Sequence, residues 1–190
     1  MPVYQKKREA KLIGQQQMEV NYRARMQEHA VGAESFCIVA ENRMAGSSPL
    51  SVYALRLSPG EEILTSLIMF VKDKKLKAPF IITCVGSVTK ATLRLANATA
   101  LNTNEIVHLN ERFEIVSLVG TLNEVPHLHI ALADKDGRVI GGHVLGDLEV
   151  FTTAEIVIGE SVGLEFTREM DDRTGFLELA ISSRSIQDQS

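Results

Sequence analysis

Residues 126–143 read PHLHIALADKDGRVIGGH, and this stretch predicts a β-hairpin. Apolar and polar side chains alternate on either side of residues 135–137 (KDG), which have the composition of a three-residue hairpin loop with its glycine in the left-handed conformation. Such a loop pairs Asp134 with Arg138 and thereby sets the register of both strands. We therefore expect antiparallel strands joined by short turns to be the building unit of the fold.

The three histidines of this hairpin form a candidate metal site. His127 and His129 are two residues apart and share one face of their strand, and the register places His143 opposite His129. Opposed Cβ atoms lie roughly 5 Å apart, so three imidazoles can converge on one ion. Neutral imidazoles suit zinc, copper, nickel or iron, and three protein ligands leave a fourth position open, as in catalytic zinc sites. The alternative is a half-exposed histidine cluster at a subunit contact.

Other side chains near this site in the sequence are harder to assign. Four carboxylates are candidates for orienting a ligand or acting as a general base, and sequence spacing does not choose among them. They are Asp134, Asp147, Glu149 and Glu155. The doublet Gly141-Gly142 indicates a bulge or a close backbone approach. No nucleophile elbow or phosphate-binding glycine motif is present, so catalytic residues stay unassigned, and His29 and His108 are predicted to be surface residues.

The remaining pattern predicts an α+β fold, a mostly antiparallel β-sheet with one principal helix packed on it. Residues 61–72 have helical spacing, with acidic residues first, lysines last, and Ile63, Leu67, Phe70 and Val71 on one face. Strands are predicted at 51–57, 80–85, 91–96, 113–122, 127–133, 139–145, 154–158 and 176–181.

Composition and charge limit the domain organisation and the binding partners that we expect. We expect a polar, partly helical or disordered extension at 1–34, one domain at 35–183 and a tail at 184–190. The net charge of −4 disfavours direct binding to a phosphate backbone. Cys37 and Cys84 lie in apolar runs and are predicted to be buried, reduced thiols. Since no run approaches the ~20 apolar residues that span a bilayer, we expect a cytoplasmic protein without membrane contact, with a nuclear location as the alternative.

Three motifs resemble those of the plants-and-prokaryotes-conserved (PPC) domain. Residues 112–122 (RFEIVSLVGTL) are similar to its RFEI-x-S-L-x-G core, and residues 86–94 (GSVTKATLR) to its G-S-x-x-x-A-x-L-R segment. The run from His127 through Gly142-His143-Val144-Leu145-Gly146 looks like its second hallmark. The resemblance covers about residues 36–182.

This resemblance implies a homotrimer and, from the three histidines matching those of stand-alone prokaryotic members, a zinc site at His127, His129 and His143. Plant members join the domain to AT-hooks and act as nuclear DNA-binding regulators, but this sequence has no Arg-Gly-Arg-Pro hook, which puts direct DNA binding in doubt. Two hypotheses follow: a metal-binding homotrimer that is an enzyme or a small-molecule sensor, and an interaction module tied to transcription.

Overall fold

A computed structural model describes residues 46–99, 101–102 and 105–184 of the chain. The helix and strands, in chain order, are β1 (Leu50–Leu57), α2 (Ile63–Lys74), β2 (Pro79–Val88), β3 (Ala91–Arg94), β4 (Ile106–Leu109), β5 (Phe113–Thr121), β6 (His127–Ala133), β7 (Val139–Gly146), β8 (Val150–Ser161), β9 (Leu164–Asp171) and β10 (Phe176–Ser183). Eight strands form one sheet in the order β1-β8-β2-β5-β6-β7-β3-β4, and β9 and β10 form a separate hairpin.

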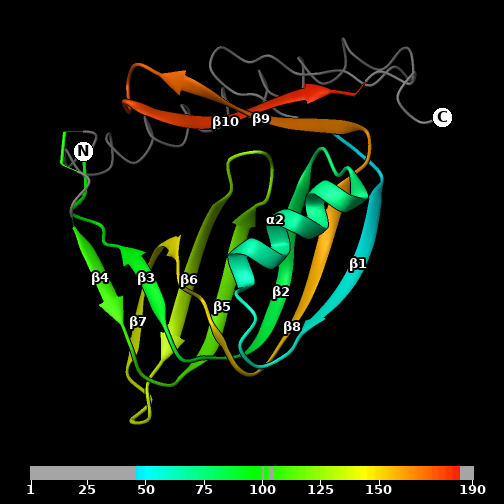
Figure 1. Ribbon diagram of the computed structural model, residues 1–190. Helices are drawn as coiled ribbons and strands as arrows, with labels where there is room; N and C mark the ends of the chain where they lie inside the picture. The colour runs from blue at the N-terminus through cyan, green and yellow to red at the C-terminus, as the bar shows by residue number, and fades with distance from the viewer. Residues whose placement is uncertain (1–45, 100, 103–104, 185–190) are drawn as a thin grey trace, which may run out of the picture. The chain divides into compact units, whose positions relative to one another are not determined.

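The predicted fold class is confirmed. All strand pairs of the described residues are antiparallel, and α2 packs on one face of the large sheet (Figure 1). Every predicted strand is present, most of them one to four residues longer or shorter than expected. Two strands escaped prediction, the short edge strand β4 and the hairpin strand β9.

The helix begins where a carboxylate caps it. Glu62 accepts hydrogen bonds from the backbone N–H groups of Leu64 and Thr65, at 3.2 and 2.6 Å, which satisfies two donors of the first turn. The same carboxylate accepts the N–H of Leu148 at 3.0 Å and so fixes the helix to the turn before β8. At the other end Lys75 adopts the left-handed conformation that closes many helices.

The core lies between α2 and the sheet. Ile63 and Leu67 of the helix are fully buried, as their spacing predicted, and Phe70 packs edge-on against Tyr53 of β1. Leu128, Ile130 and Leu132 of β6 point into the same layer and are at most 3% exposed. Because side chains alternate along a strand, the histidines of β6 necessarily lie on the opposite, outer face of the sheet.

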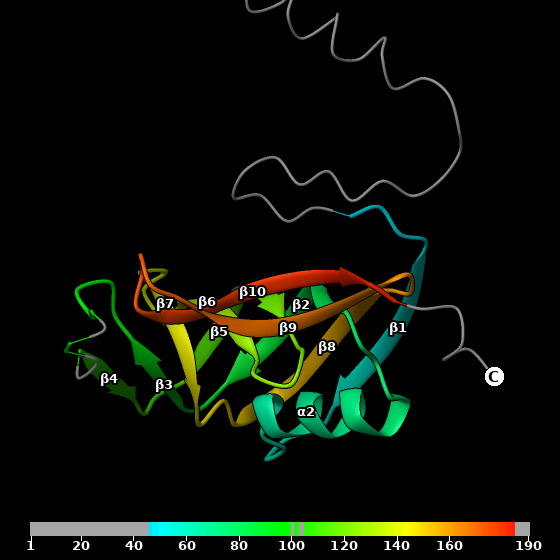
Figure 2. The same cartoon turned by 90° about the horizontal axis from the view of Figure 1, so that it is seen from above.

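The β9–β10 hairpin crosses the sheet at the end where β5 stops and β6 starts (Figure 2). It is held there by a backbone hydrogen bond from Phe166 to Lys77 and by a bond of 2.7 Å from the Arg168 guanidinium to the Thr121 hydroxyl. The hairpin therefore adds side chains beside the first residues of β6. No helix in the described part of the chain is both long and apolar enough to cross a membrane.

Candidate metal centre

The structure brings His127, His129 and His143 together as the hairpin register predicted. His129 pairs directly with His143. The turn between them has the expected geometry, since the N–H of Asp134 donates to the Arg138 carbonyl oxygen at 2.9 Å and φ of Gly137 is +75°. A one-residue slip would have placed the histidines on the buried face, so this turn is what aims them outward.

The imidazole nitrogens fit the spacing that a metal ion requires. One nitrogen from each of His127, His129 and His143 lies within 4.8 Å of the other two, and the Nε2 atoms of His127 and His129 are 3.2 Å apart. Two nitrogens about 2.0–2.1 Å from a tetrahedral zinc ion are separated by about 3.3–3.4 Å. The three rings thus need only small rotations to surround one ion, and the donor set suits zinc.

Burial and nearby cations lower the pKa values of His127 and His143. Desolvation, aided by the Arg94 guanidinium, lowers the pKa of His143 to about 4. Desolvation also lowers the pKa of His127, with Arg168 as the next contributor, although Glu178 opposes the shift. The buried Nδ1 atom of His143 has no hydrogen-bond partner within the described residues. A neutral ring with a free nitrogen is the form that binds a metal.

A pocket of about 420 Å³ opens beside His127 and His143. Its charged lining residues are Arg94 of β3, Arg168 of β9 and Glu178 of β10. The Arg94 guanidinium lies 5.6 Å from the centre of the Phe176 ring, which forms part of the apolar wall. The site therefore combines three imidazoles with two guanidinium groups and one carboxylate.

The four carboxylates proposed from the sequence lie elsewhere. Asp134 accepts two backbone N–H groups of its own turn, and Asp147 accepts the Thr92 hydroxyl at 2.6 Å. Glu149 forms an ion pair with Lys90. Glu155 lies in β8, opposite Arg56 of β1. The carboxylate that lines the pocket beside His127 and His143 is instead Glu178 of β10. The sequence analysis missed it because β9 was not predicted, and without β9 the β9–β10 hairpin could not be placed beside β6.

Of the histidines and cysteines outside the cluster, His108 and Cys84 lie in the described part of the chain. His108 is exposed, as predicted, and its Nδ1 atom shares a hydrogen bond of 2.9 Å with the Thr92 hydroxyl. Cys84 is a buried free thiol, as predicted, and burial raises its pKa to about 11. His29 and Cys37 lie outside the described residues, so their predicted environments stay predictions.

Close backbone approach explains the glycines around the site. A Cβ atom on Gly142 would lie 2.7 Å from the Arg94 carbonyl oxygen, and one on Gly141 would lie 2.5 Å from the Ile130 carbonyl oxygen. The neighbouring strands β6 and β3 therefore lie too close to β7 for a larger residue at Gly141 or Gly142. This confirms the predicted close backbone approach. Within the described strands, the break in register beside β7 lies farther along, between Thr92 and Leu93 of β3.

Residues 44–162 match the sequence model of the Plants and Prokaryotes Conserved domain, abbreviated PCC or PPC. This match includes both strands that carry the histidines. The chain belongs to the PPC domain family. The β9–β10 hairpin, which supplies Arg168 and Glu178, lies beyond the residues that match the family model.

Curated PPC relatives include bacterial and plant proteins. A bifunctional protein GlmU from Synechococcus sp. (strain JA-3-3Ab) is 44% identical over 133 residues, which are 70% of this chain and 21% of that protein. The AT-hook motif nuclear-localized protein 8 of Arabidopsis thaliana is 29% identical over 58% of this chain and 30% of its own length. The predicted kinship with plant AT-hook proteins is thus confirmed, and the chain spans less than a third of either relative.

Solved PPC structures confirm the fold. A hypothetical protein from Salmonella cholerae-suis superposes with a TM-score of 0.69 at 41% identity, covering 73% of this chain and 98% of that one. The metal-containing protein AF0104 from Archaeoglobus fulgidus superposes with a TM-score of 0.58 at 28% identity, covering 68% of this chain and 93% of its own. A related PPC protein is therefore known to contain a metal.

Proposed function

We propose that this PPC protein is a metal-binding homotrimer in which His127, His129 and His143 hold a zinc ion. The observation that carries the proposal is the convergence of three imidazole nitrogens within 4.8 Å on the outer face of the sheet. The metal-containing archaeal relative supports it. The lowered pKa values of His127 and His143 add to this support, because a ligand that is already neutral releases no proton when the metal binds.

A zinc ion held by the three histidines would lie beside a pocket that can accept a small anion or a water molecule. A zinc ion bound by three imidazoles supplies a Lewis acid and lowers the pKa of a bound water. Arg94 and Arg168 line the adjoining pocket and would attract an anionic ligand toward the histidines. Glu178 lies in the same wall, within electrostatic reach of His127, and is the candidate acceptor for a proton from bound water.

Elemental analysis of purified, untagged protein tests the metal. We expect near-stoichiometric zinc in the parent protein and in a His108→Ala control, which removes an exposed histidine remote from the cluster. Changing His127, His129 and His143 to Ala should abolish the zinc. Absence of any transition metal in the parent, even after incubation with Zn²⁺ and desalting, would contradict the proposal.

A DNA-associated interaction module is the second candidate, favoured by the similarity to a plant AT-hook nuclear protein. The net charge of −4 leaves little attraction for a phosphate backbone, so contact with other regulatory proteins fits this reading better than direct DNA binding. Fluorescence anisotropy with labelled duplex DNA tests for the direct DNA binding that this second candidate function allows. A dissociation constant in the micromolar range or tighter that weakens steeply with salt would favour the DNA-associated reading.

A further inference from the structure

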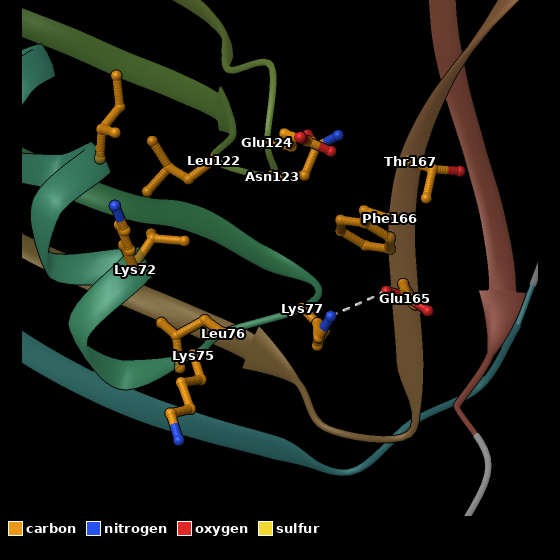
Figure 3. Close-up of a pocket in the computed structure, with 12 residues that line it drawn as sticks. Lys72, Lys75, Leu76, Lys77, Leu122, Asn123, Glu124, Glu165, Phe166 and Thr167 are labelled. Carbon is orange, nitrogen blue, oxygen red and sulfur yellow. Dashed lines mark hydrogen bonds and ion pairs between the residues drawn. The ribbon is translucent and has the colours of Figure 1, made fainter. Parts of the chain in front are cut away.

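A second pocket, of about 630 Å³, lies at the C-terminal end of α2 (Figure 3). The loop after β5 and the beginning of β9 form its other walls, and it shares no lining residue with the histidine pocket. Its volume is within the range of about 300–1,000 Å³ that small-molecule sites occupy. Five apolar residues line it: Ile68, Val71, Leu76, Leu122 and Phe166.

One polar side chain in this wall lacks the partners it needs. Asn123 is only 4% exposed, and neither its amide nitrogen nor its amide oxygen has a hydrogen-bond partner among the described residues. A buried amide without partners destabilises a fold, and such groups are rare in native proteins. Figure 3 shows Asn123 on the loop between β5 and β6, with the Phe166 ring reaching from β9 toward that loop. Asn123 lines the pocket, so a bound ligand is the candidate partner for this amide.

The charges around the pocket favour an anion. Lys72, Lys75 and Lys77 line it, against Glu124 and Glu165. Lys77 and Glu165 form an ion pair of 3.3 Å, which leaves two lysines facing a single glutamate. In Figure 3 the Lys72 side chain extends from α2 toward Leu122, whereas Lys75 extends the other way. Lys72 is thus the cation placed to meet a bound anion.

We propose that this pocket binds a small amphipathic hydroxy acid. Its carboxylate would contact Lys72 and accept from the Asn123 amide nitrogen, its hydroxyl group would donate to the amide oxygen, and its hydrocarbon body would lie against Leu122 and Phe166. An isolated phosphate fits less well, because the walls are largely apolar and carry no arginine fork. This inference does not depend on a metal at the histidines.

Calorimetric titration of the full-length chain with 2-hydroxyoctanoate and octanoate tests the proposal. We expect saturable binding of both acids, with the hydroxy acid about fivefold tighter because its hydroxyl group pairs with a buried amide. Lys72→Glu should weaken both acids about tenfold. Lys74→Glu makes the same charge change on the same helical turn but outside the pocket, and should change affinity by no more than about twofold.

Asn123→Leu separates a binding role from a structural one. Removing an unpartnered buried amide should leave the melting temperature of the free protein unchanged or raised, and it should erase the preference for the hydroxy acid. A lowered melting temperature with the preference intact would show that Asn123 serves the fold.

Three other results would overturn the proposal. One is no saturable binding of either acid. Another is equal weakening by Lys72→Glu and Lys74→Glu. The third is loss of binding in an Arg94→Gln variant, because the acid would then occupy the histidine pocket. Zinc content, measured on the same samples, reports the metal proposal independently.

Discussion

Gly120 determines where His127 can lie. It sits in β5 with φ of +134°, a conformation that residues with a Cβ atom rarely adopt. A Cβ atom there would also collide with the carbonyl oxygen of His127 on the neighbouring strand. The glycine of the RFEI-x-S-L-x-G motif therefore allows the two backbones to approach at His127, the first of the three candidate metal ligands.

Replacing Gly120 with Ala should damage both stability and the site. We expect the free energy of unfolding to fall by about 2 kcal/mol more than in a Gly146→Ala variant, together with weaker zinc binding. Gly146 is the matched control, because its φ is +144° yet a Cβ atom on it would meet nothing within 4 Å. Urea denaturation and zinc titration measure the two effects. Equal losses in both variants would mean that backbone strain alone, and not the contact with His127, matters.

The elements that carry the histidines could be predicted, whereas one wall of their pocket could not. The β6–β7 register follows from local turn chemistry at Asp134 and Gly137, so the sequence of 18 residues was sufficient. Strand β9 reads LEFTREMD, with four charged side chains, and a lone two-stranded hairpin is marginal in water. Its placement depends on distant contacts such as Arg168 with Thr121, which no local pattern encodes.

The turn of the β9–β10 hairpin should be sensitive to acid. The Arg173 guanidinium and backbone N–H hold the pKa of Asp171 at about 2, below its ordinary 3.8. A lowered pKa means that the ionised carboxylate stabilises the hairpin above about pH 4, and that this contribution is lost as the pH falls toward 2.

Asp171→Asn should therefore speed amide hydrogen exchange of Arg173 at pH 6, relative to the parent and to an Asp172→Asn control beside it. The difference between Asp171→Asn and the parent should fall to about half near pH 2, where half of the parent carboxylates are protonated. NMR titration of the Asp171 carboxyl carbon reads the pKa directly, and a midpoint near 4 would contradict the assigned contact.

At the scale of the whole molecule, the face of the sheet that carries the histidines also has exposed apolar side chains. Val52, Val85 and Val119 are 57%, 62% and 48% exposed, and Val119 pairs directly with His129. Antiparallel sheets commonly leave one face to water, and that face is then polar. Exposed valines on three strands instead indicate a protein contact, which supports the proposed homotrimer. The sequence predicted this assembly only through family resemblance, because alternation cannot reveal what covers a face.

Val85→Lys tests the assembly. Sedimentation equilibrium of the parent should give three times the mass of the chain. The lysine would place an unpaired charge in the contact, which costs several kcal/mol, so the dissociation constant should rise at least about a hundredfold. Met69→Lys is the matched control: Met69 is 66% exposed but lies on α2, on the far side of the sheet. A monomeric parent at tens of micromolar would contradict the trimer, and dissociation by Met69→Lys would place the contact on the helical face instead.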